Sequence, residues 1–126
     1  GVTVLSNPAL GSRGPRVEQV ARELAAGQAS PAFAALADEL AGWLAPALEN
    51  CGALLAHNVL SLHKNLALTA ALQRLHAAGR LPRLLAWCHD FAWRDPLYQA
   101  DLHPGFPWDL LRRPWRQIPM LRSISA

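Results

Sequence analysis

Two histidine-containing pairs in the chain could bind a ligand or move a proton: His57-Asn58 and His89-Asp90. Imidazole side chains titrate near neutral pH, so His89 with the carboxylate of Asp90 beside it could act in proton transfer. Together the four side chains offer hydrogen-bond donors and acceptors. A ligand with many hydroxyl groups needs this mixture, because each hydroxyl both donates and accepts. The two pairs therefore predict a site for a polyhydroxylated ligand.

Each pair directly follows a short apolar run that is typical of a buried strand, residues 53–56 for the first and 84–88 for the second. Between the runs, leucines recur at helical spacing over residues 68–75, and Gly79 ends that helix. This order predicts a strand, a crossover helix and a second strand parallel to the first. The carboxyl ends of parallel strands meet at one edge of the sheet, where open α/β sheets bind their ligands. We therefore expect both pairs to lie side by side at that edge.

The residues before this unit predict one strand and two helices. Residues 2–5 are rich in β-formers and predict a strand, and the apolar spacing of residues 17–24 predicts a short helix. A second helix is predicted over residues 31–48, where a serine precedes a proline at the first helical position. Gly42 and Pro46 weaken the second half of this helix, so we expect a kink or an early end there.

Residues 91–116 carry many aromatic side chains among prolines and acidic residues, and no single period fits them. Such a long irregular segment is typical of a binding loop. Within it, Trp93, Tyr98 and Trp108 could cover the apolar faces of a sugar ring. Residues 118–124 predict a last strand. The alternation of strands and helices predicts an α/β fold with a mostly parallel sheet covered by helices.

The segment just before the crossover helix allows two interpretations. Asn65 is a favourable N-cap residue for that helix, or it contacts a ligand. Lys64 could direct its ammonium group at a phosphate or carboxylate of a ligand, assisted by the helix N-terminus. We expect His63 to be a solvated loop residue.

The residues that could bind zinc do not predict a metal site. They are His57, His63, Cys88, His89 and His103, and their spacing matches no compact zinc pattern. Cys88 and His89 are neighbours in a predicted strand, so their side chains face opposite sides of the sheet. The chain also contains no Gly-x-Gly-x-x-Gly or P-loop pattern. We therefore expect neither a metal nor another cofactor in this chain.

The composition is that of one folded domain of 126 residues, with just over half of the residues apolar. The net charge of +3 comes mostly from scattered arginines, with a small group at Arg112, Arg113 and Arg116. A nucleic-acid partner would need a denser basic stripe, so we expect none; phosphate or an anionic membrane surface fits better. Cys51 and Cys88 are too few for a disulfide framework, and we expect two buried thiols in a reducing cytoplasm.

Three stretches of the chain resemble the amino-terminal half of a group 1, family 4 glycosyltransferase of the GT-B fold. They are residues 57–69, 86–90 and 103–111, and the resemblance extends over about 53–125. It implies a Rossmann-like three-layer domain with a mostly parallel sheet. Residues 1–126 would then form a single partial amino-terminal domain, the incomplete half of a GT-B enzyme.

The resemblance also implies an activity and roles for particular residues. Enzymes of this family transfer a sugar from a nucleotide-sugar donor to an acceptor, usually with retention of the anomeric configuration and without a metal. The donor is bound mainly by the carboxy-terminal domain, and the acceptor is a sugar or a lipid-linked molecule. His89 would face the transferred sugar, with Asp90 as its catalytic neighbour. The residues implied on the acceptor side are His57, Asn58, Lys64 and Asn65.

The chain departs from the family pattern in two ways. The first strand of the family with its glycine-rich loop has no counterpart, and the donor domain lies outside the chain. We therefore expect a fragment that is inactive alone, with exposed strand edges through which it could form an oligomer. The expected location is the cytoplasm, with peripheral contact to the inner membrane face as an alternative.

Two other functions remain open on the sequence. One is a non-catalytic α/β binding module that uses the aromatic segment 91–116. The other is a metal-dependent hydrolase.

Overall fold

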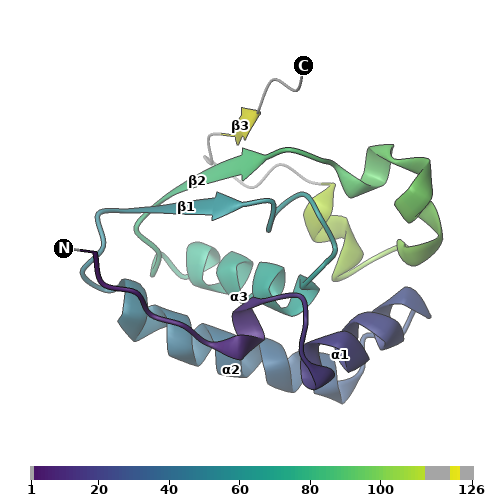
Figure 1. The fold of residues 1–126 in the computed structure, drawn as a ribbon, viewed down its shortest axis with the longest axis horizontal. Coiled ribbons are helices and arrows are strands. Elements are labelled where there is room, and N and C mark those ends of the chain that lie inside the picture. Colours follow the sequence, from purple (N-terminus) through teal and green to yellow (C-terminus); the bar gives the residue numbers. More distant parts are fainter. Residues whose placement is uncertain (1, 113–119, 123–126) are drawn as a thin grey trace.

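The structure is a computed structural model that describes residues 2–112 and 120–122 (Figure 1). Its helices and strands are, in chain order, α1 (Pro15–Ala25), α2 (Pro31–Leu48), β1 (Ala53–His57), α3 (Leu66–Ala77), β2 (Arg83–Cys88) and β3 (Met120–Arg122). Four short 3-10 helices complete the order, namely η1 (Pro8–Leu10), η2 (Ala92–Arg94), η3 (Pro96–Asp101) and η4 (Trp108–Leu111). No helix among the described residues is both long and apolar enough to cross a membrane.

The three strands form one parallel sheet in the order β1-β2-β3. The register of β1 on β2 runs from Ala53 opposite Arg83 to His57 opposite Trp87. The predicted unit of strand, crossover helix and parallel strand is therefore confirmed. β3 lies within the predicted last strand, 118–124; the remaining residues of that prediction lie outside the described part of the chain.

Helix α3 is the centre of the apolar core. Its first seven residues are all buried, and Figure 1 shows the helix between the sheet and α2. A helix that is apolar on all sides is stable only when it is covered on all sides. In α3 the cover comes from the sheet on one side and from α2 on the other (Figure 1), where Leu36, Leu40 and Leu44 of α2 are buried.

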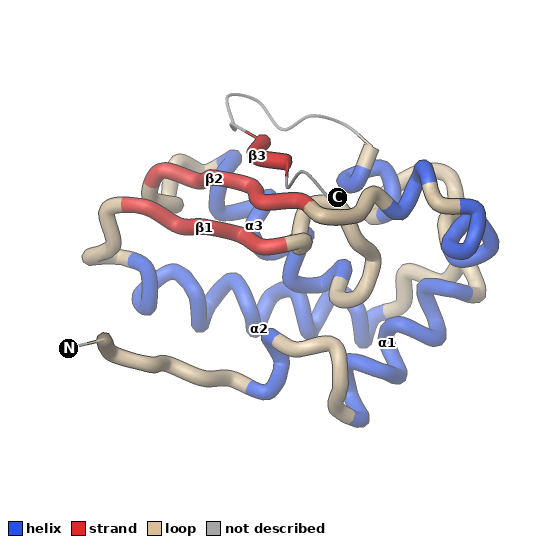
Figure 2. Tube along the Cα trace, turned by 45° about the horizontal axis from the view of Figure 1, so that its top comes forward, coloured by secondary structure: helices blue, strands red, loops and turns tan. Residues whose placement is uncertain are grey.

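The helices cover one face of the sheet, and the other face is open in the described part of the chain (Figure 2). On the helix side, Ala56 and Ala86 are buried. On the opposite side, Leu55 is 52% exposed and Trp87 is 39% exposed. The α/β class is as predicted, and within the described residues the helices lie on one side of the sheet (Figure 2).

The predicted strand at residues 2–5 is wrong. These residues are extended but pair with no strand among the described residues, and they run along α2 on the side away from the sheet (Figures 1 and 2). Their β-forming side chains remain exposed, since Val2, Val4 and Leu5 pack into no core. A high β propensity cannot form a strand when no sheet edge is within reach.

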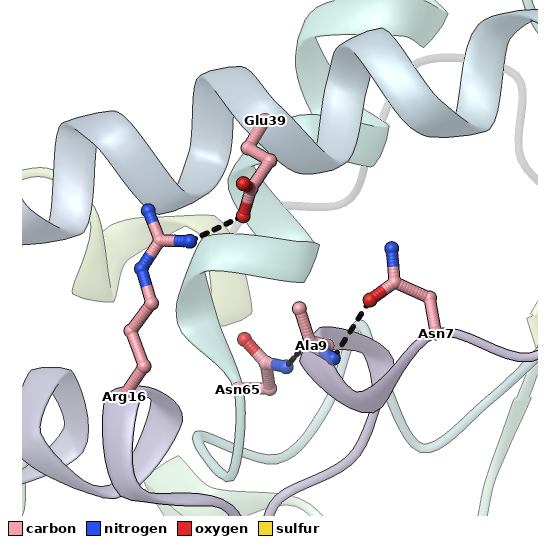
Figure 3. Close-up of polar contacts among 5 residues, drawn as sticks. All are labelled: Asn7, Ala9, Arg16, Glu39 and Asn65. Carbon is pink, nitrogen blue, oxygen red and sulfur yellow. Dashed lines mark hydrogen bonds and ion pairs between the residues drawn. The ribbon is translucent and has the colours of Figure 1, made fainter.

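The early end of α2 that Gly42 and Pro46 predicted does not occur, because the helix continues to Leu48. Pro46 lies in the last turn, so it removes one backbone hydrogen bond, to the carbonyl of Gly42, without interrupting the buried stretch before it. An ion pair between Arg16 and Glu39 joins α2 to α1 (Figure 3). The prediction of two buried thiols is confirmed for Cys88, which is buried. It is wrong for Cys51, which is exposed just after α2.

The hydroxyl of Thr69 joins α3 to the segment that follows β1. Thr69 is fully buried, and its Oγ1 donates to the carbonyl oxygen of Val59 at 2.7 Å. In Thr69→Val the hydroxyl is replaced by a methyl group, and the carbonyl loses its partner. We expect the free energy of unfolding to fall by about 2 kcal/mol in a urea titration, since an unpaired buried polar group costs this much. Thr69→Ser keeps the hydroxyl and loses one methyl group, so we expect the free energy of unfolding to fall by about 1 kcal/mol. A Thr69→Val protein as stable as the wild type would contradict this role.

Candidate functional site

The two histidines of the predicted pairs lie against each other at the carboxyl edge of the sheet. The ring centroids of His57 and His89 are 4.8 Å apart, with the rings nearly perpendicular at 88°. His57 is the last residue of β1 and pairs with Trp87, so two further residues of the chain bring His89 beside it. The expected proximity of the two pairs is therefore confirmed. We call this edge, formed by His57, Asn58, Trp87, His89 and Asp90, the rim.

Asn58 holds the two strand ends together at the rim. Its backbone N–H donates to the carbonyl oxygen of Trp87 at 2.7 Å. Its side-chain Oδ1 accepts from the backbone N–H of His89, also at 2.7 Å. Both contacts require the left-handed backbone conformation of Asn58, whose φ is 61°, and asparagine tolerates this conformation better than most residues. Asn58 is thus a positioning residue for His89 in addition to any contact with a ligand.

Trp87 is a rim residue that the sequence-based prediction missed. Its ring stacks with that of His89 at a centroid distance of 6.4 Å and an angle of 29°. The strand alternation contains the signal, because Leu84, Ala86 and Cys88 are buried and the residue between the last two must face the opposite side. An exposed aromatic face on the sheet therefore lies next to both imidazoles.

A pocket of about 190 Å³ opens beside the rim, at the N-terminus of α3. His57, Asn58 and Lys64 line one part of it, and Gly11 and Ser12 of the N-terminal segment line another. Apolar side chains complete its lining. The pocket therefore depends on two segments that are more than forty positions apart in the chain.

Asn65 brings the N-terminal segment to this pocket. Its Nδ2 donates to the carbonyl oxygen of Ala9 at 2.8 Å (Figure 3). The same Nδ2 also donates to the carbonyl oxygen of Gly11 at 2.8 Å. Its Oδ1 accepts from the N–H of Leu68 at 3.1 Å, which confirms the N-cap interpretation. With both polar atoms of its amide engaged, Asn65 positions the pocket wall.

The prediction of a solvated His63 is wrong, because its side chain is only 14% exposed. Nε2 of His63 lies 3.2 Å from Oδ2 of Asp101, and its ring packs edge-on against Tyr98 at 5.0 Å. The ammonium group of Lys64 lies over the same tyrosine ring, 4.9 Å from its centroid. The segment 91–116 thus supplies the partners of two residues that precede α3.

The prediction that Trp108 presents an open aromatic face is also wrong, because this side chain is 6% exposed and packs against His103. Trp93 is half-buried against Phe91 at a ring distance of 4.8 Å. The described residues of this segment, 91–112, contain three short 3-10 helices and pack on the core. This packing closes most of the aromatic surface that the prediction assigned to a ligand. Residues 113–116 lie outside the described part.

Within residues 2–112 and 120–122, no three side chains of histidine, cysteine, aspartate or glutamate come together as a metal site. Asp90 is exposed at the rim, next to His89. The rim can therefore offer two imidazoles and an indole ring to one ligand, with Lys64 at the neighbouring pocket.

The chain matches no protein-family model, no curated protein and no solved structure. Its functional interpretation therefore depends on the resemblance of the sequence motifs and on the geometry of the rim.

The Asn58 side chain should protect the backbone N–H of His89 from hydrogen exchange. Asn58→Gly keeps the left-handed backbone but removes the acceptor, so we expect exchange of the His89 amide to accelerate about tenfold, the effect of losing about 1.4 kcal/mol. Asn58→Asp keeps an acceptor oxygen and should change the exchange rate of the His89 amide little. Hydrogen exchange followed by NMR measures this rate in both variants. Equal protection in the wild type and in Asn58→Gly would show that the contact does not hold the strand ends.

Proposed function

We propose that the chain is the acceptor-side domain of a group 1, family 4 glycosyltransferase, which transfers a sugar from a nucleotide-sugar donor to an acceptor with retention of configuration. The observation that supports this most is the convergence of His57 and His89 at the carboxyl edge of two parallel strands. The sequence motifs that contain these residues are the ones that resemble the family.

In this proposal the rim residues act on the transferred sugar and the acceptor. His89 faces the transferred sugar, and Asp90 beside it accepts hydrogen bonds from the sugar hydroxyls. His57 contacts the acceptor, while Asn58 keeps the backbone of His89 in position. Trp87 presents its ring to the apolar face of a sugar, the role that the sequence suggested for other aromatic residues.

The proposal also gives a role to the open face of the sheet, as a surface that further helices cover. A Rossmann-like three-layer domain needs helices on both faces, so further elements of the same domain would cover Leu55 and Leu85. The nucleotide-sugar is bound by a second, carboxy-terminal domain across a cleft. Transfer takes place in the cytoplasm, to a sugar or to a lipid-linked acceptor at the inner membrane face.

A non-catalytic binding module is the second candidate. The observation that favours it is the exposure of two large apolar side chains on the segment 91–116, Leu97 and Phe106. Neither side chain belongs to the rim, so this function would give His57 and His89 no role.

His89→Ala in the complete gene product should lower kcat for sugar transfer about 100-fold, because it removes a polar contact to the reacting sugar. His76→Ala, in the last turn of α3, is the control and should retain activity. Transfer is measured with a panel of nucleotide sugars, and folding with a urea titration. No transfer by the wild type from any donor, or full activity of a folded His89→Ala protein, would contradict the proposal.

Trp87→Ala should raise KM for the acceptor about fivefold, since an aromatic face contributes about 1 kcal/mol beyond the area that it buries. Trp87→Phe keeps a flat ring and should remain within about twofold of the wild type. Initial-rate measurements at varied acceptor concentration separate KM from kcat. Equal KM values for all three proteins would show that this ring does not contact the acceptor.

A further inference from the structure

A second, larger pocket lies next to the one at the rim, with a volume of about 430 Å³. Its walls come from three parts of the chain that are distant in sequence: residues 12–25, which include the loop before α1 and α1 itself, residues 63–64, and the last residue of η3. The lining residues are Ser12, Arg13, Ala21, Ala25, His63, Lys64 and Asp101. Ser12 and Lys64 also line the pocket at the rim, so the two pockets adjoin each other.

The two cations of this pocket have no carboxylate partner among the described residues. Two other arginines, Arg16 and Arg74, form ion pairs with acidic residues of α2. Among the described residues neither Arg13 nor Lys64 forms an ion pair, and the ammonium group of Lys64 lies over the ring of Tyr98. The pocket therefore has two positive groups available for a ligand.

The one carboxylate in the lining is already paired. Oδ2 of Asp101 faces Nε2 of His63 at 3.2 Å, and the His63 ring is fixed edge-on against Tyr98. The same tyrosine ring supports the ammonium group of Lys64. This arrangement keeps the carboxylate with the imidazole, and it holds Lys64 before any ligand arrives, which lowers the entropic cost of binding.

We propose that this pocket binds the phosphate group of a phosphorylated sugar, and that the acceptor of the proposed transferase is therefore anionic. Arg13 and Lys64 come from separate segments, and a phosphate has enough oxygens to accept from both at once. The volume lies in the range of sites for small organic ligands, so it accommodates the phosphate with part of the attached sugar. Ala21 and Ala25 of α1 give it an apolar wall.

Only the statement that the bound phosphate belongs to the acceptor depends on the proposed function. The position of the pocket connects the phosphate site with the rim. A phosphate held by Lys64 and Arg13 leaves the attached sugar free to extend past Ser12 toward His57, along the line where the pockets adjoin. Binding itself requires no transfer activity, so it can be tested separately.

The experiment titrates the chain of residues 1–126 with inorganic phosphate, with glucose 1-phosphate and with glucose, and follows the amide signals by NMR. Saturable binding of both phosphates with shifts at Ser12 and Lys64 is expected, and weak or no binding of glucose. Arg13→Ala and Lys64→Ala should each raise Kd about tenfold, because a charge-assisted hydrogen bond contributes about 1.4 kcal/mol or more. Arg80→Ala, an exposed arginine in a different pocket, is the matched control and should bind as the wild type.

Equal weakening by Arg13→Ala and Arg80→Ala would overturn the proposal, because it would indicate attraction to the net positive charge alone. Lack of phosphate binding would also overturn it. Sedimentation with phosphatidylcholine vesicles, with and without phosphatidic acid, identifies the source of the phosphate. Binding to glucose 1-phosphate without vesicle binding indicates a soluble sugar phosphate, and vesicle binding that needs Arg13 indicates a lipid headgroup. If phosphate binds as described while His89→Ala retains transfer activity, the site stands and the role of the rim fails.

Discussion

The parallel pairing of β1 with β2 is the constraint on which the candidate site depends. In this register His57 lies opposite Trp87, and the chain needs only two more residues to place His89 beside the first histidine. A shift of the register by one residue would turn the outward side chains toward the helices and separate the two imidazoles. The buried residues of both strands oppose such a shift, because Ala56 and Ala86 would then exchange places with larger side chains that now lie on the open face.

Two asparagines hold the strand ends and the N-terminal segment in position around the candidate site. Asn58 connects the ends of β1 and β2 through one backbone and one side-chain hydrogen bond. Asn65 starts α3 and at the same time ties the N-terminal segment to it through two further bonds. A hydrogen bond of this kind contributes about 1 kcal/mol. Both asparagines act by positioning their neighbours.

The sequence predicted the elements that have a strong local pattern. The β1-α3-β2 unit follows from two apolar runs around a helical leucine period, and the N-cap follows from the residue type of Asn65. The failures at His63 and Trp108 have a common physical cause, which is contact between distant segments. His63 is enclosed by Asp101 and Tyr98, and Trp108 is covered by the core; neither neighbourhood can be read from adjacent residues. In contrast, Trp87 was predictable from strand alternation, because its neighbours on either side had to be buried. The functional roles of all these residues stay predictions.

The contact between the rings of His57 and His89 can be measured directly in solution. In a NOESY spectrum of the chain with assigned histidine ring protons, we expect a cross-peak between the two imidazoles that disappears in His57→Ala. Assigned, well-resolved ring signals without such a cross-peak would contradict it, because the two strand ends would not form a common rim.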